Sequence, residues 1–235
     1  MQPTGQSTAD TQGKVSVWRW PLDAEMTAEG LSAEESRRAD RFYHERDRRR
    51  FLVAHHGLRR VLGDALGIRP AEVTLQTGPH GKPSLAGVGP RRLEFNLTHS
   101  GEWALLALSD DGPVGVDLEQ QRPVGESQAI ADRHYAQLER SRAPDPDSAD
   151  YERWFFETWT AKEAALKLLG AGLALPLHQV ETPPADGWAE LPRPNPLQLA
   201  RCWIGRLDAP DGFRAALATP QRPQSVAMHT LEQVV

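Results

Sequence analysis

The chain has 235 residues, of which 39% are hydrophobic and 25% are charged, and its formal net charge is −5. This composition is typical of a soluble globular protein, and the length allows one large domain or two domains of about 100 residues each. The negative charge argues against wholesale nucleic-acid binding, and no apolar run approaches the roughly 20 residues that a membrane-spanning helix needs.

The N-terminal segment, residues 1–14, is polar and lacks the apolar core of a signal peptide. We expect it to be a flexible extension of the folded part. Cys202 is the only cysteine, so an internal disulfide is excluded, which agrees with a reducing compartment. These features predict a cytoplasmic protein that does not enter a membrane.

The first half of the chain predicts a strand, two helices and a hairpin. The signals are apolar alternation, a Ser–Glu capping-box pattern, and Gly and Pro at the ends of elements. In order they are a strand from Val15, a helix start at Ser32 with Glu35, a helix from about Asp47 to Leu66, loops at 80–83 and 85–90, and the strands LEFNL and WALLALS joined by the turn THSGE. Residues 37–50 concentrate positive charge within this half.

The second half predicts a comparable order of elements. In order they are a strand in PVGVDLE, a helical segment at 126–140, a loop at 141–150, a helix from about Tyr151 to Leu169, a loop at 183–196, the strands RCWIGRL and FRAALAT, and a peripheral tail. The two long helices align when Ala54 is placed on Ala161, an offset of 161 − 54 = 107. Similar composition alone is the simpler explanation of such short matches.

We interpret this similarity as an internal duplication. The sequence then predicts an α/β (α+β) fold with two similar lobes, residues 15–112 and 113–220, related by a pseudo-twofold axis, followed by a peripheral tail at 221–235. A cleft between two lobes is a natural place for a ligand, so we expect the active site there.

Two acidic side chains lie in the predicted strand GVDLE. Asp117 and Glu119 are two positions apart, so they share one face of the strand. Taken alone, the pair is explained better as a solvated acidic face on an edge strand. Repulsion between the two carboxylates mildly favours a cation between them.

The stretch WTAKEAALK places a further carboxylate beside an apolar stripe. Trp159, Glu163 and Lys167 follow one another at four-residue steps and form one ridge of a helix. A surface ion pair between Glu163 and Lys167 is worth only about 0.3–0.5 kcal/mol, whereas a carboxylate pushed into an interface costs several kcal/mol without a partner. A divalent cation shared with the carboxylates of GVDLE would compensate that cost.

The chemistry of these ligands favours Mg²⁺. Asp117, Glu119 and Glu163 offer only oxygen, and there is no histidine or cysteine cluster of the kind that zinc prefers. Magnesium held by a few carboxylates usually completes its shell with water and phosphate oxygens. The sequence therefore predicts a substrate that carries phosphate.

The rare lysines support a phosphate site. Lysine occurs only at positions 14, 82, 162 and 167, and three of these four lie in or near candidate motifs. A compact ammonium on a flexible stem suits phosphate, although chance clustering is the alternative. Thr98, His99 and Ser100, at a strand end, offer hydroxyl, imidazole and backbone donors, although a lone histidine at a strand end is more often structural.

The motifs FNLTHSGEWALLALS, GVDLE and FFETWTAKEAALK, in this order, resemble those of the 4′-phosphopantetheinyl transferases of the surfactin-synthetase-activating type. The upstream stretch LSAEESRRADRFYHERDRRR followed by HGKP is similar to the N-terminal lobe of that family, and the resemblance covers about residues 15–220. It implies a transfer of phosphopantetheine from coenzyme A to a serine of an acyl or peptidyl carrier protein, with release of adenosine 3′,5′-bisphosphate. It also implies a monomer that depends on Mg²⁺, with Mn²⁺ as a substitute.

The resemblance implies a role for each matching residue. Asp117, Glu119 and Glu163 match the metal ligands, Lys167 matches the lysine that reaches the pyrophosphate, and Asp117, Glu163 and Lys167 form the catalytic set. The coenzyme A site is matched by Arg38, Arg50, Gly81, Lys82, Pro83, Thr98, His99, Ser100, Lys162 and Lys167. There is one departure, since Glu35 stands where the family can have a further basic residue, for which Arg37 or Arg38 would compensate.

Two other functions fit parts of the pattern. An Mg²⁺-dependent phosphodiesterase would release phosphopantetheine from coenzyme A without an acceptor protein. A coenzyme A-binding module without catalysis would show no Mg²⁺-dependent turnover, and the complete acidic triad argues against it. The sequence does not specify the carrier protein, the tolerance for acyl-coenzyme A or the general base, although residues 126–150 are a plausible docking region for a carrier.

Overall fold

The computed structural model describes residues 13–24, 30–78, 81–87, 93–170, 176–184, 187–192 and 201–231. The helices are α1 (Ala33–Ala39), α2 (Glu45–Leu66), α3 (Ser127–His134), α4 (Gln137–Arg140) and α5 (Ala149–Leu169), with short 3₁₀ turns at Pro70–Glu72 and Leu177–Gln179. The strands are β1 (Lys14–Pro21), β2 (Leu75–Thr77), β3 (Pro83–Leu85), β4 (Glu94–Ser100), β5 (Trp103–Ser109), β6 (Gly115–Gln120), β7 (Trp188–Glu190), β8 (Trp203–Leu207), β9 (Phe213–Thr219) and β10 (Ser225–Thr230). None of the helices in these ranges is long and apolar enough to cross a membrane.

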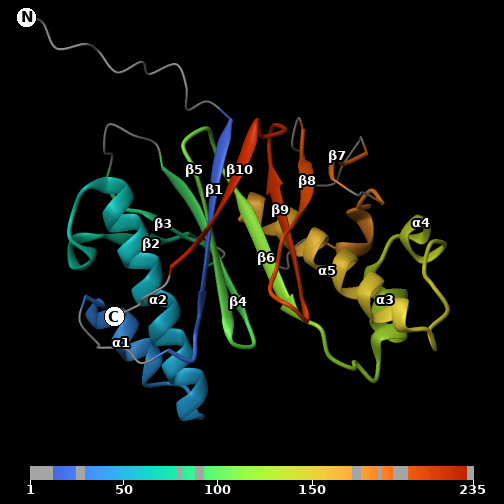
Figure 1. Cartoon of the computed structure of the whole chain (residues 1–235), viewed down its shortest axis with the longest axis horizontal. Coiled ribbons are helices and arrows are strands. Elements are labelled where there is room, and N and C mark those ends of the chain that lie inside the picture. Colours follow the sequence, from blue (N-terminus) through green and yellow to red (C-terminus); the bar gives the residue numbers. More distant parts are fainter. Residues whose placement is uncertain are drawn as a thin grey trace, which may run out of the picture.

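The strands form two four-stranded sheets and a small two-stranded sheet. The first sheet has the order β10-β1-β5-β4, the second has the order β6-β9-β8-β7, and β2 pairs with β3. Figure 1 shows α2 against the outer face of the first sheet and α5 against the outer face of the second, while the two sheets lie next to each other in the middle. The molecule therefore has the layer order helix, sheet, sheet, helix.

Alternation along β5 explains these layers. Leu106 and Leu108 belong to the core under α2, whereas Leu105 and Ala107 belong to the core that the two sheets share. Because successive side chains of a strand point to opposite faces, a strand with both faces buried is apolar at nearly every position. The sequence WALLALS has this pattern.

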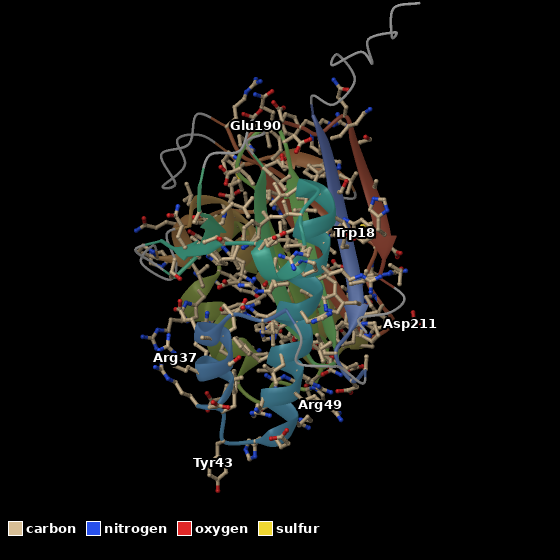
Figure 2. All side chains as sticks on the ribbon, turned by 90° about the vertical axis from the view of Figure 1, so that its left-hand side faces the viewer. Trp18, Arg37, Tyr43, Arg49, Glu190 and Asp211 are labelled. Atoms are coloured by element: carbon tan, nitrogen blue, oxygen red, sulfur yellow. The ribbon has the colours of Figure 1, made fainter. Side chains whose placement is uncertain are left out.

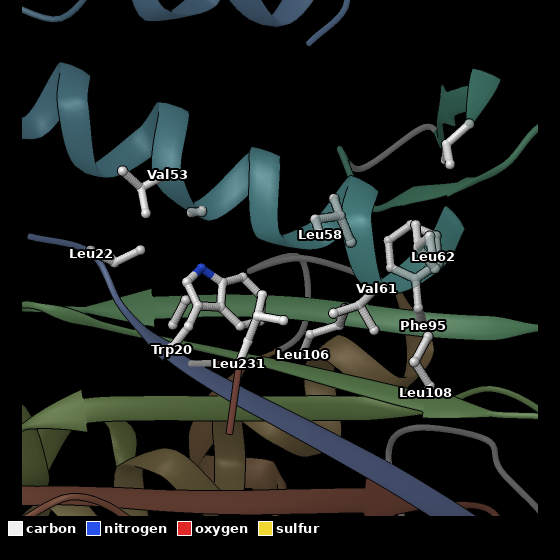
Figure 3. Packing of buried hydrophobic residues seen from close by; sticks show 13 residues of the cluster. Trp20, Leu22, Val53, Leu58, Val61, Leu62, Phe95, Leu106, Leu108 and Leu231 are labelled. Carbon is white, nitrogen blue, oxygen red and sulfur yellow. The ribbon is translucent and has the colours of Figure 1, made fainter. Parts of the chain in front are cut away.

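The core under α2 is built around Trp20, which is fully buried (Figure 3). Trp20 and Trp18 face α2, whereas Val15 and Val17 of the same strand face the second sheet. Gly57 of α2 lies so close that a Cβ there would be 2.5 Å from the indole ring. Only a glycine allows this helix to approach the tryptophan, so we infer that the pair fixes the distance between α2 and the sheet.

The two lobes have the same connectivity. In each lobe a strand leads through helices to an antiparallel hairpin, and the second hairpin strand pairs with the first strand, as β5 pairs with β1 and β9 with β6. The predicted helices at 47–66 and 151–169 correspond to α2 and α5. The mixed α/β architecture is as predicted, and we retain a pseudo-twofold relation between the lobes as a proposal.

We expected residues 221–235 to form a peripheral tail. The part of this segment that the structure describes, up to residue 231, is instead joined to the first sheet. Strand β10 pairs in parallel with β1, with Lys14 opposite Ser225 and Arg19 opposite Thr230. Leu231, which follows this strand, belongs to the core under α2 (Figure 3). The polar alternation of SVAMHT concealed this strand, because it lies at the edge of the sheet with much of its surface exposed.

Candidate active site

Strands β4 and β6 lie side by side where the two sheets meet (Figure 1). Side chains of β4 bridge to the backbone of β6: Asn96 Oδ1 accepts a hydrogen bond from the Val116 amide at 2.8 Å, and Ser100 Oγ accepts one from the Gln120 amide at 3.1 Å. These contacts place the polar end of β4 against the acidic strand β6.

Helix α5 lies directly on β6. A Cβ at Gly115 would be 2.1 Å from the Ala164 carbonyl oxygen and 2.3 Å from the Leu168 amide nitrogen. The glycine that opens GVDLE therefore lets the helix backbone touch the strand. This close approach places Glu163 and Lys167 over the face of β6 that carries Asp117 and Glu119.

The side chains at this interface form two hydrogen-bonded groups. Lys167 Nζ lies 2.5 Å from Asp117 Oδ1 and donates a hydrogen bond to Thr98 Oγ1 at 3.0 Å. Ser100 Oγ donates a hydrogen bond to Glu119 Oε2 at 2.8 Å. Two residues that the sequence assigned to the catalytic set, Asp117 and Lys167, therefore meet, and the hydroxyls of Thr98 and Ser100 lie beside them.

Burial sets the charge state of these carboxyls. It raises the pKa of Asp117 to about 7, against the opposing effect of Lys167, and the nearby Glu119 and Glu163 raise it further. Burial also raises the pKa of Glu163, again against Lys167 and together with Glu119. The three carboxyls are thus close enough to repel one another, which is the electrostatic condition that a bound cation relieves.

No three His, Cys, Asp or Glu side chains in the described ranges are arranged as a ready-made metal centre, and Lys167 lies against Asp117. The donor set nevertheless fits a hard cation. Asp117 Oδ2 is buried and has no hydrogen-bond partner among the residues that the structure describes. Such an unsatisfied carboxylate oxygen, with Glu119 and Glu163 nearby, is the type of ligand that Mg²⁺ prefers.

A separate pocket of about 430 Å³ opens on the other face of β4. It is lined by Arg38, Arg41, Phe42, Phe51, His55, Gly81, Pro83, Leu97 and His99. The segment Thr98–Ser100 was predicted as a turn, but it continues the strand, so His99 faces this pocket while its two neighbours face β6. One strand thus presents donors to both sites.

The rim of this pocket is basic and aromatic. Arg38 lies over the ring of Phe51, with 5.2 Å between its guanidinium carbon and the ring centroid. Arg41 and Phe42 add a second arginine and a second aromatic ring to the lining. Figure 2 shows three further side chains of the same two helices that are not part of the lining, namely Arg37 on α1, Arg49 on α2, and Tyr43 projecting outward between them. Arginine beside aromatic surface, at the mouth of a pocket, suits an aromatic base that carries phosphate.

A buried group behind the pocket was missed by the sequence analysis. Glu35 Oε1 lies 2.9 Å from His55 Nδ1, and Glu35 Oε2 accepts a hydrogen bond from Arg59 Nε at 2.7 Å. Glu35 also completes the predicted capping box with Ser32. It is therefore a structural carboxylate that orients His55 at the pocket wall. The pair His55–His56 could have indicated this group from the sequence. Adjacent residues of a helix point in different directions, and His55 is the one that lines the pocket.

Three of the predicted coenzyme A residues do not line this pocket, and each contacts another part of the chain. Lys162 is fully buried, forms an ion pair with Glu139 at 2.7 Å and donates to the carbonyls of Leu177 and Val180. The ammonium group of Lys82 contacts the Lys167 and Leu168 carbonyls at the end of α5. Arg50 donates two hydrogen bonds of 2.8 Å to Asp23.

Comparisons with known proteins identify the family. Residues 18–111 match the model of the N-terminal domain of 4′-phosphopantetheinyl transferases, and residues 113–218 match the model of the 4′-phosphopantetheinyl transferase superfamily. The 4′-phosphopantetheinyl transferase HetI of Nostoc sp. is 36% identical over 174 residues, which are 72% of this chain and 73% of the relative.

A second relative matches along more of the chain. The 4′-phosphopantetheinyl transferase Sfp of Bacillus subtilis is 28% identical over 208 residues, which are 87% of this chain and 90% of that protein. A putative 4′-phosphopantetheinyl transferase of Synechocystis sp. is 34% identical over 167 residues, 70% of this chain and 68% of its own length. The chain therefore belongs to the 4′-phosphopantetheinyl transferase superfamily, as its motifs predicted.

Proposed function

We propose that this protein transfers 4′-phosphopantetheine from coenzyme A to a serine hydroxyl of an acyl or peptidyl carrier protein, with Mg²⁺ as the metal and with adenosine 3′,5′-bisphosphate as the leaving product. The observation that carries this proposal is the position of β4 between two sites. Its Thr98 and Ser100 face the acidic interface with Lys167, and its His99 faces the pocket with Arg38. A nucleotide in the pocket could therefore extend its pyrophosphate to the acidic interface.

The pocket supports nucleotide binding by its chemistry. Arg38 and His99 can donate to phosphate, and Phe51 offers an aromatic face. Gly81 has a positive φ of 87°, and no atom lies within 4 Å of the place where a Cβ would be, so a ligand can approach its backbone. These groups are our candidates for binding the adenosine and its 3′-phosphate. The positions of Lys82, Lys162 and Arg50 leave these three residues out of the proposed contact set.

The chemistry is a displacement at phosphorus. The serine oxygen forms a bond to the phosphorus that bears the pantetheine, and the bond from that phosphorus to the bridging oxygen breaks. Adenosine 3′,5′-bisphosphate leaves with the electron pair, and the serine proton passes to a base, for which Glu163 is our candidate because burial raises its pKa and makes it a stronger base. Lys167 neutralises the charge that develops on the phosphate oxygens.

Asp117, Glu119 and Glu163 would hold the metal. Bound there, Mg²⁺ supplies a positive charge that offsets the negative charge of the pyrophosphate. Mn²⁺, which accepts the same oxygen ligands, is the expected substitute. Thr98 holds the ammonium group of Lys167, and Ser100 holds the carboxylate of Glu119, so β4 orients one group from each of α5 and β6.

The decisive experiment is intact-protein mass spectrometry. Purified fatty-acid, polyketide and peptide-synthetase carriers are incubated with the protein, coenzyme A and Mg²⁺, and we expect the mass of phosphopantetheine to be added to at least one carrier. A carrier whose acceptor serine is replaced by alanine is the matched control. Release of phosphopantetheine to water at the same rate with and without carrier would overturn the proposal in favour of a phosphodiesterase.

The metal is tested in the same assay. Treatment with a chelator should stop the transfer, and added Mg²⁺ or Mn²⁺ should restore it. Full activity in the presence of the chelator would contradict the metal assignment while leaving the transfer itself in place.

A further inference from the structure

The side chain of Lys82 links two parts of the molecule that the proposed reaction must bring together. Its backbone neighbours Gly81 and Pro83 line the nucleotide pocket. Its Nζ donates hydrogen bonds to the Lys167 carbonyl at 2.6 Å and to the Val114 carbonyl at 3.0 Å, and reaches the Leu168 carbonyl at 3.5 Å. The loop of the pocket is thereby tied to the last turn of α5 and to the connection between the lobes.

These contacts leave Lys82 no donor for a phosphate. An ammonium group has three N–H donors, and the three carbonyls account for all of them. The last carbonyls of a helix have no partners within the helix, and they lie at the negative end of its dipole, where a cation is stabilising. Lys82 therefore completes the C-terminal end of α5 from outside the helix.

The surroundings of the side chain agree with a fixed position. Gly170, the left-handed residue that ends α5, leaves space for the stem of Lys82: a Cβ on Gly170 would lie 3.3 Å from Lys82 Cδ. Burial lowers the pKa of Lys82 to about 8, against the attraction of Glu94. A partly desolvated ammonium group depends on the acceptors it has, so these hydrogen bonds hold both sides firmly.

We propose that Lys82 is a positioning residue that couples the nucleotide pocket to Lys167. Lys82 holds the backbone of Lys167 in the last turn of α5, and the side chain of Lys167 in turn meets Asp117 and Thr98. A ligand that orders the loop of Gly81 and Pro83 then also orders the catalytic end of α5. This inference rests on the proposed function for Lys167 as a catalytic group.

A double-mutant cycle tests the coupling. Lys82→Met keeps the aliphatic stem and removes the donors, and we expect kcat to fall roughly tenfold to 100-fold, as for a misplaced catalytic group, with KM for coenzyme A changing by less than about threefold. In the Lys167→Ala background the same substitution should change kcat by less than about twofold, because its target is absent. Lys14→Met, on an exposed lysine of β1, is the matched control and should leave both parameters unchanged.

Hydrogen exchange provides a readout that does not depend on transfer. Adenosine 3′,5′-bisphosphate should slow amide exchange in residues 166–170 of the wild-type protein, and this protection should be lost in Lys82→Met while Lys14→Met keeps it. Should Lys82→Met fail to fold, Lys82→Gln, which keeps an N–H donor group, takes its place and should show intermediate protection.

The outcomes separate the two proposals. An equal loss of kcat in both backgrounds, or a rise in KM alone, would make Lys82 a general structural residue or a phosphate ligand and overturn the coupling. Unchanged protection in the Lys82 variants would overturn it as well. Ligand-dependent protection without transfer to any carrier would refute the proposed function and leave the coupling supported.

Discussion

The ammonium nitrogen of Lys167 lies 2.5 Å from Oδ1 of Asp117, so the last turn of α5 supplies a counter-charge to a carboxylate buried in β6. The opposite oxygen of Asp117 has no hydrogen-bond partner among the described residues. The carboxylate can therefore pair with a lysine through one oxygen and bind a metal cation through the other.

Replacing Lys167 by alanine should lower both stability and turnover, because Lys167 is the counter-charge of Asp117 and a proposed catalytic group. The buried Asp117 loses its counter-charge, so we expect the free energy of unfolding to fall by about 1–3 kcal/mol, less than for a fully buried pair because Lys167 is partly exposed. Turnover should fall by about 100-fold or more, as for loss of a group that stabilises developing charge. Mg²⁺ should raise the melting temperature of Lys167→Ala more than that of wild type, and an equal rise would show that lysine and metal do not share Asp117.

Replacing Glu163 by glutamine should abolish transfer while the fold is kept, because the amide retains the shape but neither accepts a proton nor binds a cation well. The measurements are carrier modification and circular dichroism. Glu152→Gln, which removes another carboxylate from the first turn of the same helix and lies outside the candidate docking region at 126–150, is the control and should transfer normally. Near-normal transfer by folded Glu163→Gln would remove this residue from the mechanism.

Arg38 and Arg50 should respond differently to loss of the 3′-phosphate of coenzyme A. Arg38 lines the pocket, so Arg38→Ala should weaken binding of coenzyme A by about tenfold and weaken binding of the 3′-dephosphorylated analogue much less. Arg50 is paired with Asp23, so Arg50→Ala should weaken binding of the two ligands equally, if at all. Calorimetry decides between them, and selectivity for Arg50 instead would restore the assignment made from the sequence.

Glu35 should make the stability depend on acid. Burial raises its pKa, but hydrogen bonds from His55, Ser32 and Arg59 outweigh this effect and hold the pKa at about 2, below the ordinary 4.5. The folded state therefore releases this proton at lower pH than the unfolded state. The resulting stabilisation, about 3 kcal/mol, is present above pH 4.5 and is lost as the pH falls toward 2.

Denaturant unfolding between pH 6 and pH 3 measures this contribution. Wild type should lose most of the 3 kcal/mol over that range, in addition to what other groups lose, and Glu35→Gln should lack this part of the dependence. Glu34→Gln, on the exposed neighbouring position of α1, should follow wild type. Parallel curves for wild type and Glu35→Gln would contradict the role of the buried pair.

Lys162 should behave as a residue of the core. Its fully buried ion pair with Glu139 predicts that Lys162→Met lowers the free energy of unfolding by about 3–5 kcal/mol, because a carboxylate is left without its partner. The double variant Lys162→Met/Glu139→Gln should recover part of this loss. KM for coenzyme A of the folded single variant should stay within about twofold of wild type, and a large increase would return Lys162 to the substrate site.

The sequence was sufficient to predict features that depend on local patterns. The capping box of Ser32 and Glu35, the end of α2 at Gly67, and the strand in GVDLE all follow from neighbouring residues, and the structure has them. The approach of α5 to β6 was predicted from one ridge of side chains. Gly115, which makes that approach sterically possible, was not recognised, because its neighbours in space are distant in sequence.

The direction in which long side chains point could not be predicted from local sequence patterns. Lys82 and Lys162 stand in the right motifs, yet each ends on backbone carbonyls of another element. Their environment depends on how helices end and on which loops cover them, and a motif contains neither. The same holds for β10, whose polar sequence gives no sign that it pairs with β1.

The pairing of β10 with β1 has a consequence for biosynthesis. Arg19 and Thr230 are hydrogen-bonded although they are 211 positions apart, so the first sheet lacks its edge strand until nearly all of the polypeptide has left the ribosome. Up to that moment β1 presents open backbone groups to other nascent chains. The N-terminal half on its own should thus be aggregation-prone, and the mature architecture can close only after translation has passed the last strand.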